Sequence, residues 1–67
     1  MMCVKIIELI GTSNKSFEDA IQDAINTASK SLRGISGVDV VGQTALVENN
    51  KITEFRVNVK VAFSLEK

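Results

Sequence analysis

The chain has 67 residues, which leaves no room for more than one small domain, and we expect residues 1–67 to form it. Eight basic and eight acidic residues cancel to a formal net charge of zero, and no basic stripe that would bind nucleic acid is visible. The single cysteine, Cys3, excludes an internal disulfide, and the absence of histidine excludes Cys/His zinc sites and histidine-based hydrolysis.

The first predicted element is a strand at residues 4–10, which are rich in β-branched side chains. Lys5 and Glu8 interrupt its apolar run. Residues 11–14, Gly-Thr-Ser-Asn, are typical turn residues. They lack a Walker-type lysine and a GxGxxG series, so a strand-to-helix turn is favoured over a phosphate-binding loop.

A helix is predicted to begin after Ser16, whose hydroxyl can accept the backbone N–H of Asp19, and to end at Gly34. Its apolar residues follow the i, i+3, i+4, i+7 spacing of a helix with one buried face. Lys30 and Arg33 suit the negative C-terminal end of the helix dipole. The apolar stripe consists of Phe17, Ala20, Ile21, Ala24, Ile25, Ala28 and Leu32.

Two further strands are predicted on either side of Asn49 and Asn50, which tolerate positive φ and favour a two-residue hairpin turn. In the last strand, apolar and polar residues alternate, which indicates one face on the core and one polar face. We therefore predict an α+β fold: a β-α-β-β protomer whose three-stranded antiparallel sheet wraps one helix. The core-facing residues are Phe55, Val57, Val59, Val61, Phe63 and Leu65. The other face carries Glu54, Arg56, Asn58, Lys60, Ala62, Ser64 and Glu66.

The two-residue turn would also set the register of the hairpin, because it places Glu48 opposite Lys51. A bulge near Gly42 would break this register beyond that point. The expected pairs on the core side are Thr44–Phe55, Val40–Val59 and Val38–Val61. The expected pairs on the outer side are Asp39–Lys60, Gln43–Arg56, Val41–Asn58 and Gly37–Ala62.

The small size of the chain favours self-assembly. A domain this short buries only roughly 60% of the surface that its unfolded chain exposes, so its stability alone is marginal. With 45% hydrophobic residues and no disulfide, the chain is expected to bury surface against copies of itself. Residues 1–3 lead into the first strand without a signal sequence, and no apolar run approaches the roughly 20 residues of a membrane span. We therefore expect a cytoplasmic protein with no membrane or nucleic-acid partner.

The order and spacing of these motifs resemble the dodecin family. The resemblance covers about residues 3–66 and is carried by the Gly-Thr-Ser turn, Ser16-Phe17 at the helix start, the Ala-Ile repeat at 20–21 and 24–25, and residues 59–63. It implies that twelve β-α-β-β protomers assemble into a hollow shell. Dodecins that bind flavin hold paired riboflavin or flavin mononucleotide (FMN) molecules between protomers, and store or buffer them rather than catalyse a reaction.

The resemblance also identifies the candidate site. In dodecins that bind flavin, a tryptophan stacks on the isoalloxazine ring and a glutamine hydrogen-bonds to its edge. This chain has Gly37 at the tryptophan position and Arg56 at the glutamine position, with Gln43 predicted opposite Arg56. The chain has no tryptophan or tyrosine to replace the ring, and a guanidinium cannot accept the flavin N3–H. The flavin site is therefore expected to be degenerate.

Two ligand hypotheses follow. The calcium dodecins, a subset of the family, also lack the tryptophan and have arginine at the glutamine position, and residues 51–56 resemble that subset. No calcium ligand follows from the sequence. The favoured function is a non-enzymatic homododecamer, a 12-mer that binds or stores a small ligand or calcium. The alternative is a dodecin that still binds riboflavin or FMN, with Arg56 contacting the ribityl or phosphate group; no catalytic residues support an enzyme.

Overall fold

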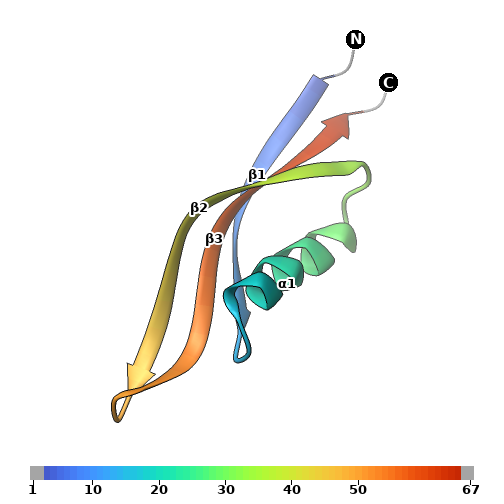
Figure 1. Ribbon diagram of the computed structural model, residues 1–67. Helices are drawn as coiled ribbons and strands as arrows, with labels where there is room; N and C mark the ends of the chain where they lie inside the picture. Colours follow the sequence, from blue (N-terminus) through green and yellow to red (C-terminus); the bar gives the residue numbers. More distant parts are fainter. Residues whose placement is uncertain (1–2, 66–67) are drawn as a thin grey trace.

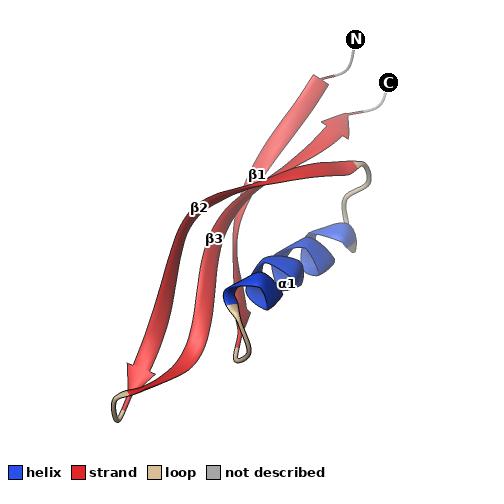
Figure 2. Ribbon diagram, in the orientation of Figure 1, coloured by secondary structure: helices blue, strands red, loops and turns tan. Residues whose placement is uncertain are grey.

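The computed structural model describes residues 3–65 and has the element order β1 (Cys3–Ser13), α1 (Phe17–Ser29), β2 (Ile35–Glu48) and β3 (Lys51–Leu65). The strands form one antiparallel sheet in the order β1-β3-β2, so the last strand of the chain is the central one. Helix α1 lies along one side of the sheet (Figures 1 and 2). The predicted β-α-β-β fold is confirmed. Predictions that concern residues 1, 2 and 66 fall outside the described residues.

Strand β1 is longer than predicted, because the glycine-containing turn residues belong to it. Gly11, Thr12 and Ser13 each pair with a residue of β3, and this pairing extends the strand to Ser13. The connection to the helix is correspondingly short. The Ser13 hydroxyl accepts the backbone N–H of Lys15 at 2.9 Å and donates to the Asp19 carboxylate at 2.6 Å. One side chain therefore ties the end of β1 to the first turn of α1.

Helix α1 begins where the sequence predicts and ends earlier. The Ser16 hydroxyl accepts the Asp19 N–H at 3.0 Å, which confirms the cap. The predicted end at Gly34 is wrong, because the helix ends at Ser29, and Lys30 and Arg33 consequently lie beyond its last turn.

The early end of the helix has a tertiary cause. The backbone N–H groups of Ser31 and Leu32 both bond to the Ala28 carbonyl, which closes the last turn. Gly34 adopts φ 73°, in the left-handed region, and its carbonyl accepts the Ser64 N–H at 3.1 Å. Gly34 thus turns the chain into β2 and fastens it to β3, instead of capping the helix.

The core lies between α1 and the central strand. Phe17 at the start of the helix meets Phe55 in an edge-to-face contact with ring centroids 4.9 Å apart. The small alanines let α1 approach the sheet closely, as predicted from the helical stripe. Leu65 departs from the predicted core face, because its side chain is exposed. The buried core residues are Ala20, Ala24, Ala28, Val57, Val59, Val61 and Phe63.

The hairpin turn is confirmed. Asn49 and Asn50 have φ values of 53° and 65°, and Glu48 pairs with Lys51. Register irregularities then interrupt the pairing of β2 with β3: one leaves Thr53 of β3 unpaired, and the next leaves Val41 of β2 unpaired.

Between the bulges at Thr53 and Val41, the pairing of β2 with β3 is therefore displaced by one residue from the predicted register. The predicted pairs fail in this segment and hold beyond it. Inside the displaced segment, the predicted pairs Thr44–Phe55, Gln43–Arg56 and Val41–Asn58 are wrong. Beyond Val41 the second bulge cancels the first. The pairs confirmed there are Val40–Val59, Val38–Val61, Asp39–Lys60 and Gly37–Ala62.

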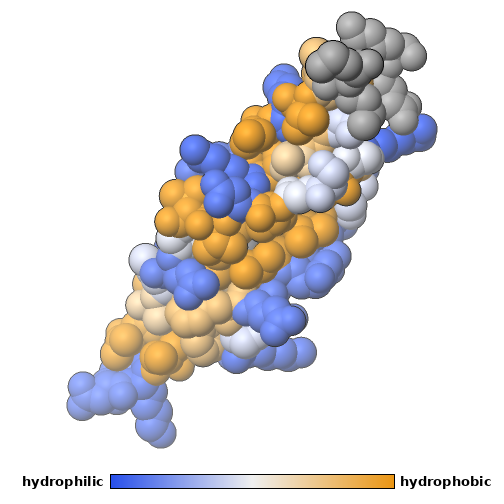
Figure 3. Space-filling view, turned by 45° about the horizontal axis from the view of Figure 1, so that its top comes forward, coloured by the Kyte–Doolittle hydropathy of each residue, from blue (hydrophilic) through white to orange (hydrophobic). Residues whose placement is uncertain are grey.

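The face of the sheet that points away from α1, here called the outer face, is less polar than predicted. It is polar along β3, but on β1 it carries Val4, Ile6 and Ile10, whose exposed fractions are 56%, 57% and 62%. Figure 3 shows hydrophobic side chains gathered along much of one side of the molecule. Among residues 3–65, no helix is long and apolar enough to cross a membrane.

Candidate ligand-binding site

A hollow of about 320 Å³ lies on the outer face of the sheet, and we call it the outer pocket. The register explains its construction. Asn58 of the central strand lies between Ile10 of β1 and Gly42 of β2. A Cβ added at Gly42 would meet nothing within 4 Å, so this glycine leaves open space beside Asn58. The lining residues are Ile10, Gly42, Gln43, Thr44, Arg56 and Asn58.

Two of the predicted site residues, Arg56 and Gln43, line this pocket. Their relation differs from the prediction, because the displaced register pairs Gln43 with Val57 and places Thr44 opposite Arg56. Sequence reasoning missed Thr44, which the undisplaced register assigned to the core side. It also left Asn58 without a role, although the alternation in β3 correctly assigned it to the polar face.

The third predicted residue, Gly37, shares the outer face but not the pocket. It pairs with Ala62, which is six residues from Arg56 along β3. At about 3.3 Å per residue, the two positions are roughly 20 Å apart. Within one copy of the chain, Gly37 and Arg56 therefore do not line a common pocket. A ligand that contacts both positions needs a second copy.

The charge of Arg56 is compensated by Glu54, its neighbour on β3. Its Nε donates to a Glu54 carboxylate oxygen at 2.6 Å, and the two side chains are 45% and 34% exposed. Exposed ion pairs of this kind stabilise a fold little, by about 0–1 kcal/mol. The ion pair matters more for ligand binding. The guanidinium still offers N–H donors to a ligand, while the pair as a whole carries no net charge.

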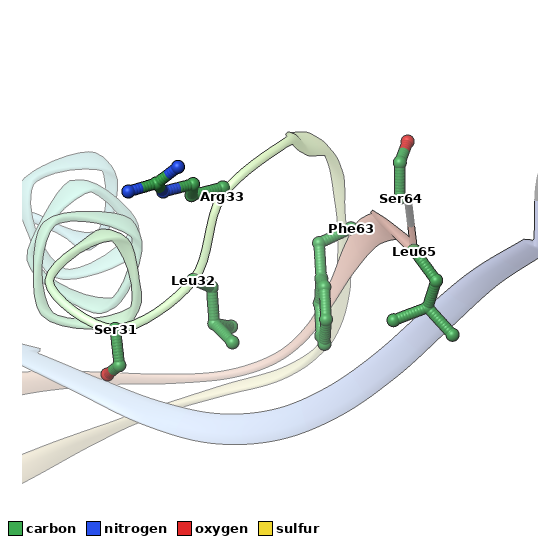
Figure 4. A pocket seen from close by; sticks show the side chains of 6 residues that line it. All are labelled: Ser31, Leu32, Arg33, Phe63, Ser64 and Leu65. Atoms are coloured by element: carbon green, nitrogen blue, oxygen red, sulfur yellow. The ribbon is translucent and has the colours of Figure 1, made fainter. Parts of the chain in front are cut away.

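Two other hollows are less suited to a ligand. One, of about 280 Å³, lies between the end of α1 and the end of β3; in Figure 4, Leu32 and Phe63 project to the same side and Ser64 projects away. Its polar groups therefore do not converge. The other, of about 270 Å³, lies on the first turns of the helix, where Ser16 and Asp19 are already engaged in capping.

The part of the chain that the structure describes holds no group of three or more histidine, cysteine, aspartate or glutamate side chains able to hold a metal ion. A calcium ion needs several oxygen ligands, usually with more than one carboxylate. A metal site within a single copy of residues 3–65 therefore has no candidate ligand set, and the metal residues stay unassigned.

Comparison with known proteins places this geometry in a family context. The family model described as Dodecin matches residues 3–66. Dodecin from Thermus thermophilus is 36% identical over 62 residues, which cover 92% of this chain and 90% of that protein. Calcium dodecin from Mycobacterium tuberculosis is 31% identical over 65 residues, which cover 97% of this chain and 92% of that protein.

Solved structures share the fold over nearly the whole chain. A crystal structure of a Thermus thermophilus protein gives a TM-score of 0.95 at 33% identity, covering 100% of this chain and 98% of that one. Dodecin from Streptomyces coelicolor gives 0.94 at 26% identity, covering 98% and 94%. The calcium dodecin of Mycobacterium tuberculosis, whose structure is described with a novel calcium-binding site, gives 0.82 at 32% identity, covering 96% and 91%.

Proposed function

This chain belongs to the dodecin family, and we propose that it is a non-enzymatic protein that binds and stores a small ligand. The observation that carries the proposal is the outer pocket. Side chains from all three strands converge there on about 320 Å³, and they combine an apolar wall at Ile10 with polar groups at Thr44, Arg56 and Asn58. Such a mixture of apolar surface and few polar groups is typical of small-molecule sites.

The proposed functional unit is a hollow homododecamer, as the family resemblance implies. The outer face of β1 supports assembly, because Val4, Ile6 and Ile10 are exposed in a single copy. The positions of Gly37 and Arg56 support it independently. They lie too far apart to share a ligand within one copy, so a site that uses both must form between copies.

The flavin site of this protein is proposed to be degenerate. Among residues 3–65 of one copy, a Cβ at Gly37 would meet nothing within 4 Å, so no group of the same copy takes the place of a stacking ring. Stacking of a base on an aromatic side chain is worth about 1–3 kcal/mol. Flavin therefore loses its main source of affinity at this position, and retained riboflavin or FMN binding is the alternative function.

Titration with riboflavin separates these two functions. We expect weak binding to the wild-type assembly and binding about 5- to 150-fold tighter, with stronger fluorescence quenching, to Gly37→Trp. The open space and the absence of a left-handed φ at Gly37 make this substitution sterically compatible in one copy. Gly37→Leu is the matched control, since it adds bulk without an aromatic face. Micromolar binding with strong quenching by the wild type would establish the alternative.

Calcium is a second candidate ligand, because a relative 31% identical to this chain is a calcium dodecin. No described cluster within one copy suits the ion, so the carboxylates would have to converge from several copies. Calorimetry of the chelator-treated assembly with calcium addresses this. Absence of heat together with an unchanged melting temperature would remove calcium from the proposal.

A further inference from the structure

Two bulges shift the middle of the β2–β3 hairpin by one residue. Thr53 and Val41 are left unpaired, and between them residues 42–46 pair with residues 54–58, which we call the displaced register. Without the bulges, β2 from residue 41 to 46 would pair with β3 from residue 53 to 58, which we call the regular register and which contains one more pair. The displaced register therefore needs a stabilising contact that the regular register lacks.

The outer pocket depends on the displaced register. In that register Gly42 lies opposite Asn58, and a Cβ added at Gly42 would meet nothing within 4 Å. In the regular register Val41 would take this place, and its side chain would fill the open space beside Asn58. Thr44 would also leave the outer face, because a shift of one residue turns each side chain to the other face.

Packing within one copy discriminates little between the two registers. The hairpin extends past α1 (Figure 1), and of residues 41–48 all are exposed except the half-buried Ala45. Register is strongly specified where one face of a strand is buried, and weakly specified where both faces are exposed. Val41 and Leu46 are 50% and 41% exposed, so an exchange of their faces removes little apolar surface from a core.

One hydrogen bond is specific to the displaced register. The Thr53 hydroxyl donates to the Leu46 carbonyl at 3.3 Å. It crosses between the strands at the point where the bulge interrupts their backbone ladder. In the regular register Thr53 and Leu46 would pair directly, and the Thr53 side chain would stand perpendicular to the sheet, away from this carbonyl.

We propose that Thr53 is a positioning residue of the outer pocket. Its hydroxyl holds the hairpin in the displaced register, and loss of this bond shifts the hairpin toward the regular register, in which Val41 closes the pocket. This role rests on the proposed function, since it takes the outer pocket as the ligand site.

Disulfide trapping in the intact assembly reports the register. Paired strand residues lie at separations that a disulfide can span. Leu46→Cys with Glu54→Cys reports the displaced register, and Ala45→Cys with Glu54→Cys reports the regular register. Both pairs also carry Cys3→Ser, because Cys3 is an exposed free thiol. Equilibration with glutathione gives the equilibrium constant for forming each disulfide.

We expect Thr53→Val to raise the constant of the regular-register disulfide about three- to tenfold relative to that of the displaced-register disulfide, the effect of one net hydrogen bond. Thr53→Ser keeps the hydroxyl, and we expect it to retain the wild-type ratio. Thr12→Val is the matched control, since it removes an exposed threonine hydroxyl of β1 outside the hairpin, and we expect it to leave the ratio unchanged.

An unchanged ratio in Thr53→Val, or an equal change in Thr53→Ser, would overturn the role of the hydroxyl. Loss of assembly in Thr53→Val but not in Thr53→Ser would assign the hydroxyl to contacts between copies and would overturn it as well. The disulfides report the register without a ligand. Titrations that find no ligand would therefore remove the proposed function and leave the register result standing.

Discussion

Gly11 shows how one residue sets the distance between the helix and the sheet. It is buried in β1, and a Cβ added there would overlap the backbone carbonyl oxygen of Ala20 and lie 3.0 Å from the Cβ of Ala24. A backbone atom of a helix cannot move aside as a flexible side chain can. The close packing of α1 on β1 therefore requires glycine at this position.

Gly11→Ala is accordingly expected to lower the free energy of unfolding by about 1–3 kcal/mol, the usual cost of overpacking a core. Gly42→Ala is the matched control, because a Cβ there meets nothing within 4 Å and its φ is not left-handed. We expect the control to change stability by less than about 0.5 kcal/mol. Equal urea midpoints for the two variants would show that the helix does not depend on this contact.

The sequence predicted which face of the sheet the site residues of β3 occupy, because apolar and polar residues alternate along that strand. Alternation in β3 assigns Arg56 and Asn58 to one face, and the structure places both in the outer pocket. Alternation does not reveal which residue of β2 pairs with Arg56, and the structure pairs it with Thr44 rather than with Gln43. The Oδ1 of Asn58 is buried without a hydrogen-bond partner among residues 3–65. This depends on the packing of three strands, so no sequence pattern predicts it.

At the scale of elements, ends set by local chemistry were predictable and ends set by tertiary contacts were not. The cap at Ser16 and the turn at Asn49–Asn50 depend on neighbouring residues, and both are confirmed. The helix end depends on the contact between Gly34 and Ser64, far apart in the chain. The bulge at Thr53 also escaped prediction; its hydroxyl bonds to the Leu46 carbonyl at 3.3 Å across the hairpin.

The hairpin turn gives a prediction at this scale. Because Asn50 has φ 65°, we expect Asn50→Ala to destabilise the protein by about 1–2 kcal/mol, whereas Asn50→Gly retains or raises stability. Asn14→Ala serves as the control, since Asn14 has no positive φ. Thermal unfolding provides the measurement. Equal stability of the alanine and glycine variants at position 50 would argue against a left-handed turn.

At the scale of the whole molecule, one copy is a long, thin body of 51 × 20 × 13 Å. The β2–β3 hairpin extends past the helix (Figure 1) and exposes Leu46, Val47 and Ile52. Together with the apolar outer face of β1, these side chains form surface that a single copy leaves in water. Burying it between copies would supply the stability that a chain of this length lacks on its own.

Assembly is also the condition on which a ligand site that includes both Gly37 and Arg56 depends. The outer pocket of one copy contains Arg56 and Asn58, and in the proposed assembly Gly37 would approach that pocket from another copy. The degenerate flavin site and its recovery in Gly37→Trp both concern the assembled protein.

The molar mass of the purified protein, measured by light scattering at low concentration, tests this central claim most directly. Twelve copies of 7.3 kDa give about 88 kDa, and we expect that mass to persist on dilution. A stable monomer or dimer under the same conditions would contradict the shell, and with it a ligand site formed between copies.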